Sequence, residues 1–116
     1  MGNLCSYYNE SIKFEEEKMV KHIVIWRMNP TEDKNEKALL IKEKLEALKN
    51  EIDCIVSIEV GINFNQTEAA SDIILVSEFK SKEDLDFYQE HPAHKAVGSE
   101  YVRPNVCERR VVDYEF

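Results

Sequence analysis

The sequence predicts an α+β fold of the ferredoxin-like type, with element order β-α-β-β-α-β, a four-stranded antiparallel sheet and helices on one face. Two observations predict it. Four short runs rich in β-branched and aromatic residues alternate with helical segments in that order. The chain has 116 residues, which is enough for one domain with a modest core.

The first predicted strand spans residues 20–28, and it is apolar on both faces. Successive side chains of a strand point to opposite faces, so each face of this strand needs cover. One face carries Val20, His22, Val24, Trp26 and Met28, and the other carries Ile23 and Ile25 between Lys21 and Arg27.

The first helix is predicted from about Thr31 to Asn50. Its apolar residues recur at steps of three and four, which places them on one helical face. These residues are Ala38, Ile41, Leu45, Leu48 and Ile52.

The second and third strands are predicted at Cys54–Val60 and Ile73–Phe79, with Gly61 and the polar residues 63–71 between them as a loop. Ser81 is the predicted N-cap of a second helix that runs to about Glu90.

Pro92 predicts a break in the helical region. Proline suits the first position of a helix and keeps the preceding residue, His91, out of the α conformation. A short helix should therefore start at Pro92 and stop before Pro104, and a last strand should run from Val106 to Tyr114. The inward residues of the short helix are predicted to be Ala93, Ala96, Val97 and Tyr101.

The break should bring Tyr88 and His94 to one corner of the fold. A phenol and an imidazole that meet there have the chemistry to move a proton. They are equally consistent with a structural pair, in which Tyr88 belongs to the core with a hydrated hydroxyl and His94 lies half exposed on the outer side of its helix.

The open face of the predicted sheet indicates a homodimer. Two helices cover only one face, and each strand also shows Val or Ile on the other. A monomer would leave that apolar patch in water, so we expect two sheets to pack face to face as a barrel.

Composition excludes several classes of partner. Fifteen Lys and Arg against 23 Asp and Glu give a net charge of −8, which argues against nucleic acid and against adsorption to anionic lipid. Cys5, Cys54 and Cys107 have no metal-type spacing and indicate a reducing, cytoplasmic setting. No apolar run approaches the roughly 18 residues of a membrane span.

Residues 1–18 differ from the rest and are predicted to be a flexible tail, with the domain at 19–116. Gly2 and Ser6 fit the N-myristoylation pattern, and Cys5 is a nearby palmitoylation candidate. Membrane association would then depend on acylation in a eukaryotic host. The alternative is a chance match or a cloning remnant.

Five segments together resemble the Dabb family of stress-responsive α/β-barrel domains. The resemblance covers Met19 to Phe116 and implies a dimeric barrel with a pocket between sheet and helices. A plant member of this family is similar to a polyketide cyclase that closes an aromatic ring by aldol condensation without a cofactor. The segments are Val20–Val24, Ser57–Gly61, Phe79–Tyr88, His91-Pro92-Ala93-His94 and Val111-Val112-Asp113-Tyr114.

The resemblance implies roles for individual residues. His94 matches the general base of that cyclase, and Tyr88 matches the tyrosine that assists it. His22 matches a pocket histidine, although a lone His on an apolar strand face is more often a core residue. Ile73 stands where the cyclase has a further pocket histidine, which puts activity on the cyclase's substrate in doubt. His91 is interpreted as a cap.

The leading hypothesis is a dimer that binds a small apolar or aromatic molecule in a pocket lined by His22, Trp26, Ile73, Tyr88 and His94. Cofactor-free acid–base chemistry would take place there, with no metal site. The alternatives are a non-enzymatic binding or stress-associated protein, and a structural module that its tail tethers to a membrane.

Overall fold

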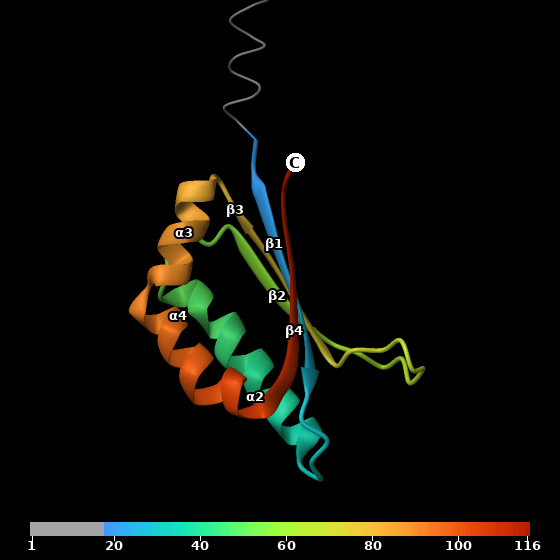
Figure 1. Ribbon diagram of the computed structural model, residues 1–116. Helices are drawn as coiled ribbons and strands as arrows, with labels where there is room; N and C mark the ends of the chain where they lie inside the picture. The colour runs from blue at the N-terminus through green and yellow to red at the C-terminus, as the bar shows by residue number, and fades with distance from the viewer. Residues whose placement is uncertain (1–17) are drawn as a thin grey trace, which may run out of the picture.

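The computed structural model describes residues 18–116 and has the predicted ferredoxin-like architecture (Figure 1). Single turns of other helix types follow α2, at Ala47–Asn50, and α4, at Gly98–Val102 and Arg103–Asn105. The main elements are β1 (Val20–Met28), α2 (Lys34–Glu46), β2 (Ser57–Ile62), β3 (Ile73–Phe79), α3 (Lys82–Glu90), α4 (Pro92–Val97) and β4 (Val106–Glu115).

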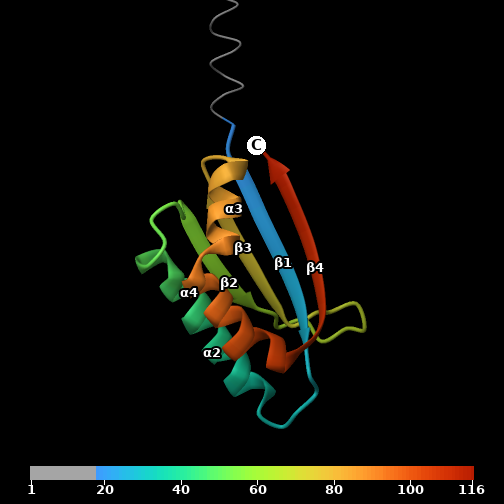
Figure 2. The ribbon, with the colours of Figure 1, turned by 60° about the vertical axis from the view of Figure 1, so that its left-hand side comes forward.

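The four strands form one antiparallel sheet in the order β2-β3-β1-β4. At the centre, Val24 lies opposite Leu75 of β3 and opposite Val111 of β4. The described helices all lie on one face of this sheet, as Figures 1 and 2 show from two sides. The predicted fold class is therefore confirmed.

The predicted core faces are also confirmed. The face of β1 that carries Val20, His22, Val24, Trp26 and Met28 is buried under the helices. The apolar stripe of the first helical region is buried opposite it, because the 3.6-residue period keeps those side chains on one side. Its members Ala38, Ile41, Leu45, Leu48 and Ile52 are each at most 3% exposed.

Several predicted boundaries were wrong. Strand two runs from Ser57 to Ile62, not from Cys54 to Val60, and Gly61 belongs to the strand because it pairs with Ile74. Cys54 instead lies in a turn, half-buried, where its thiol donates to the backbone carbonyl of Asp84.

The first helix begins at Lys34 rather than Thr31, because the turn after Pro30 continues to Asp33. Ala96 is exposed, contrary to the prediction, although Ala93, Val97 and Tyr101 pack against the core. The helical region also continues past Pro104, where the prediction had it stop. Pro104 fits there because it lies at the start of the last short turn, where its missing N–H breaks no helical hydrogen bond.

The break between α3 and α4 has the predicted construction. His91 is extended, with φ −64° and ψ 135°, and its side chain accepts a hydrogen bond from the N–H of Ala93. Ser81 caps α3 in the same way by accepting from the N–H of Asp84. His91 is thus a cap.

The other face of the sheet is free of helices, and the β2–β3 loop projects on that side (Figure 1). The register aligns Ile23 with Val76 and Val112, and Ile25 with Ile74, on this open face. Val112 is 58% exposed in the single chain. Gly2 and Cys5 lie outside the described residues, so the tail and its lipidation remain predictions.

Candidate functional site

Tyr88 and His94 meet at the break between α3 and α4. Tyr88 is near the end of α3, and His94 is the third residue of α4. Their ring centroids are 4.5 Å apart with an angle of 58° between the ring planes. The two rings are therefore in contact at a steep tilt, and the phenol makes no hydrogen bond to the imidazole.

Tyr88 is fully buried, and its hydroxyl is buried with it. The ring packs against Phe79 of β3 at a centroid distance of 5.0 Å. Its oxygen is buried and finds no hydrogen-bond partner among the described residues. Burial raises the pKa of this phenol far above its usual value, which keeps it neutral and able to donate a hydrogen bond.

His94 is half-buried, and its Nδ1 atom is buried without a partner among the described residues. Burial lowers the pKa of the imidazole, because a charged ring would lose hydration. The backbone of Gln89 opposes this shift, whereas His22, Arg109 and Arg103 lower the pKa further. His94 is therefore neutral at pH 7, with one nitrogen available as a base.

His22 approaches the same place from the sheet. It is 1% exposed, and its ring meets Tyr88 edge-on at a centroid distance of 6.2 Å. Its Nδ1 atom lies 2.5 Å from a carboxylate oxygen of Asp113. A carboxylate at one ring nitrogen fixes the orientation of the imidazole and the nitrogen that carries the proton.

Asp113 was missed by the sequence analysis as a site residue. It lies opposite His22 in the β1–β4 register, 91 positions along the chain, so both side chains are on the helix-covered face. The alternation of side chains along the strand was enough to predict this. Asp113 and Val111 are two residues apart and point to the same face, whereas Val112 between them points to the open face.

Trp26 and Ile73 lie farther along the same face. Trp26 is 5% exposed and lies directly opposite Ile73, which is 2% exposed. Four residues separate Trp26 from His22, which is about 13 Å along a strand. The structure thus gathers His22, Tyr88, His94 and Asp113, and places Trp26 and Ile73 in the core beyond them.

Two surface hollows border this cluster. One of about 460 Å³ is lined by His94 together with Gln89, Lys95, Ser99 and Arg103. Another of about 380 Å³ lies between α3 and β4, and Asp113 lines it with Lys82, Leu85 and Asp86. Tyr88 lines neither, so a ligand must displace or part the side chains above it.

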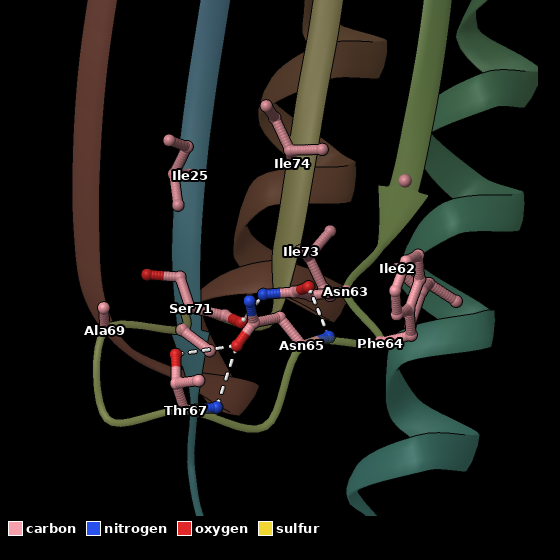
Figure 3. Close-up of a pocket in the computed structure, with 12 residues that line it drawn as sticks. Ile25, Ile62, Asn63, Phe64, Asn65, Thr67, Ala69, Ser71, Ile73 and Ile74 are labelled. Atoms are coloured by element: carbon pink, nitrogen blue, oxygen red, sulfur yellow. Dashed lines mark hydrogen bonds between the residues drawn. The ribbon is translucent and has the colours of Figure 1, made fainter.

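A further hollow, of about 470 Å³, is remote from this cluster. It lies under the β2–β3 loop on the open face of the sheet, with Ile25 and Ile74 in its floor (Figure 3). The loop is held by its own bonds, in which Asn63 accepts from the N–H of Asn65, and Asn65 from that of Thr67. The residues that line it carry no titratable side chain.

The residues of the cluster suit acid–base chemistry. A neutral imidazole and a neutral phenol supply a base and a proton donor within one contact distance. Among residues 18–116, no group of three or more His, Cys, Asp or Glu side chains is placed to hold a metal ion. In the same part of the chain, no helix is long and apolar enough to cross a membrane.

Comparison with known proteins identifies the relatives of this chain. The sequence profile of the family described as "Stress responsive A/B Barrel Domain" (Dabb) matches residues 20–116. A search of curated proteins found no match.

Solved structures give the same result. A protein from Bacteroides fragilis, described as dimeric, of unknown function and ferredoxin-like, is 42% identical with a TM-score of 0.78, covering 84% of this chain and 96% of that one. A Dabb family protein from Mesorhizobium loti is 18% identical (TM-score 0.67; 84% and 95% covered). A hydroxynitrile lyase from Passiflora edulis is 16% identical (TM-score 0.68; 86% and 94% covered). The last two show the fold alone.

Proposed function

This chain belongs to the family of stress responsive A/B barrel domains, and from that premise we propose that it is a homodimer that binds a small apolar or aromatic molecule between sheet and helices. We further propose that it performs cofactor-free acid–base chemistry on that molecule, with His94 as the base and Tyr88 as the proton donor. His22, Trp26 and Ile73 line the pocket, and Asp113 orients His22.

One observation carries the proposal. The Tyr88 hydroxyl and His94 Nδ1 are both buried, belong to touching rings and have no partner among the described residues. A buried polar atom without a hydrogen bond costs about 1–3 kcal/mol, so native proteins rarely keep one without a use. Two side by side are explained by a ligand whose polar groups complete both bonds.

The chemistry follows from the protonation states of the two groups. A neutral His94 can take a proton from an acidic carbon, and a neutral Tyr88 can donate a hydrogen bond to the oxygen on which negative charge then develops. This is what an aldol-type ring closure requires. Because Ile73 contributes no polar group, the cognate substrate needs fewer polar contacts at that end of the pocket.

A second candidate is binding without turnover. The Tyr88 side chain is fully buried under its neighbours and lines neither of the bordering hollows, which favours a slowly exchanging bound molecule over a rapidly released product. The same residues would then bind the ligand, but the ligand would not be converted to a product.

The homodimer is supported by the open sheet face. Ile23, Ile25, Ile74, Val76 and Val112 form one apolar surface without helical cover. The 42% identical protein from Bacteroides fragilis is described as dimeric. A dimer that covers this face removes these apolar side chains from water.

Native mass spectrometry tests the proposal. We expect the protein purified under mild conditions to carry a small aromatic or apolar molecule, and the Tyr88→Phe variant to carry less of it. Phe87→Leu, a change at an exposed position of the same helix, is the matched control. Equal retention by wild type and Tyr88→Phe would contradict the site. If the retained molecule is chemically unchanged after incubation, the binding function replaces the catalytic one.

A further inference from the structure

Two arginines belong to elements that border the His94 cluster. Arg103 lines the hollow of about 460 Å³ that reaches His94, in the turn after α4. Arg109 is on β4 directly opposite Trp26, so its side chain is on the helix-covered face of the sheet. Both positive charges are near enough to lower the pKa of His94.

These two arginines differ from the other two of the chain. Arg27 and Arg110 both pair with Glu108, at 3.4 Å and 3.0 Å. Within residues 18–116, Arg103 and Arg109 form no ion pair, although the chain has a net charge of −8.

Most acidic groups near the two arginines bond other partners. Glu90 pairs with Lys95, the other cation that lines the hollow, at 2.9 Å. The Asp113 carboxylate bonds His22, and Glu108, next to Arg109 in the sequence, pairs with Arg27 and Arg110. Glu100, three residues before Arg103, forms no ion pair with it.

We propose that the ligand of this site is anionic, an aromatic carboxylate or a molecule of the same charge and shape, and that Arg103 and Arg109 bind its charged group. This rests on the proposed function, because it places the aromatic body of the ligand against Tyr88 and His94. The guanidinium fork matches a carboxylate with two parallel hydrogen bonds, and such pairs are stronger than neutral ones.

Benzoate and benzamide test the proposal as probes of nearly equal shape and different charge. The chain has three histidines, so their imidazole NMR signals can be followed separately in the full-length protein. We expect benzoate to shift the His94 signals saturably, with an affinity about tenfold above that of benzamide. His91, which caps α4 outside the cluster, should not respond.

The variants Arg103→Gln and Arg109→Gln should each lower the affinity for benzoate toward that for benzamide and so remove most of the preference for benzoate. Arg110→Gln is the control, because it removes the same charge from the next residue, whose side chain is on the opposite sheet face. Sedimentation of each variant checks that its assembly is that of the wild type.

The two failures are distinguishable. Saturable His94 shifts with equal affinities for the two probes would overturn the anionic ligand and leave the aromatic site standing. The anionic ligand would also be overturned if Arg110→Gln lowers the affinity for benzoate as much as Arg109→Gln does. If neither probe shifts His94, the aromatic site itself is overturned, and the inference with it.

Discussion

At the scale of single residues, the cluster combines groups that the fold would be more stable without. The Tyr88 hydroxyl and His94 Nδ1 are buried without partners among the described residues. His22 differs, because its buried nitrogen is satisfied by Asp113. Removing a buried group that has no partner should raise the stability of the fold. Removing a buried group that has a partner should lower it.

Tyr88→Phe should therefore stabilise the ligand-free protein. The change keeps the ring against Phe79 and removes an unsatisfied hydroxyl, so we expect the free energy of unfolding to rise by about 1 kcal/mol. Thermal denaturation should show a midpoint higher by about 4 °C. Tyr114→Phe, at an exposed position, is the control and should change nothing.

The contrast with the neighbouring histidines sharpens this prediction. His22→Ala should lower the midpoint strongly, since it opens a cavity and leaves the Asp113 carboxylate without its partner. His94→Ala should have little effect on the midpoint. A loss at Tyr88→Phe as large as that at His22→Ala would show that the hydroxyl is structural.

His94 also predicts a pH dependence of stability. Its folded-state pKa is below the unfolded value of 6.5, mainly because of burial. The unfolded chain therefore binds more protons as the pH falls, so this contribution is complete above 6.5 and is lost as the pH falls below it. Urea denaturation from about pH 8 to about pH 5 should show a smaller acid loss in His94→Gln than in wild type. Parallel profiles would contradict the burial of this imidazole.

At the scale of elements, α2 protects the free edge of the sheet. Lys42 donates to the backbone carbonyl of Val60 at 2.6 Å, and Glu46 accepts from the N–H of the same residue at 3.0 Å. Lys42 and Glu46 also pair with each other at 2.8 Å, one helical turn apart. This pair satisfies both backbone groups at the middle of β2, an edge strand that would otherwise offer them to another chain.

Glu46→Gln should weaken this attachment of α2 to β2. The neutral amide loses the charge-assisted bonds to Lys42 and Val60, so we expect the free energy of unfolding to fall by about 1 kcal/mol in urea denaturation. Glu43→Gln changes the same charge at an exposed position of α2 and should be silent. Equal effects of the two variants would show that only the net charge of the helix matters.

At the scale of the whole molecule, the predictions concern the open sheet face and the N-terminal sequence. The face is apolar at its centre and has no helix over it (Figure 2). The N-terminal sequence is the part of the chain with a lipidation pattern. Each leads to a separate prediction.

Val112→Asp should dissociate the dimer. A carboxylate at this position would be buried without a partner between two sheets, at a cost of several kcal/mol. Leu39→Asp is the control, since Leu39 is 60% exposed on α2 and Val112 is 58% exposed on the sheet. Sedimentation at micromolar concentration should show a monomer or an unfolded chain for Val112→Asp and a dimer for Leu39→Asp. A wild-type protein that sediments as a folded monomer would exclude the barrel.

Gly2→Ala should shift the protein from membranes to cytosol if the N-terminus is myristoylated in a eukaryotic host. One acyl chain binds membranes only marginally, so Cys5→Ser should give a similar but smaller shift. Cell fractionation measures both. Identical fractionation of wild type and Gly2→Ala would remove the lipidation hypothesis.

The amino-acid sequence by itself determined the features of this protein that depend on local pattern. Alternation and the 3.6-residue period predicted the element order and the buried faces, and Pro92 predicted the break that brings Tyr88 to His94. The same local rules misplaced strand two, because Cys54 to Val56 has the composition of a strand and lacks the strand pairing of Ser57 to Ile62.

Only the tertiary structure decided how the site is put together. His22 and Asp113 are 91 positions apart and meet through the register of two strands, which no local pattern encodes. Tyr88 also packs on Phe79 of β3, and its ring meets that of His94 in a tilted contact without a hydrogen bond between them. Likewise, the pairing of β1 with β4 places Arg109 on the helix-covered face and Arg110 on the open face, and a shift of one residue in that register would exchange them.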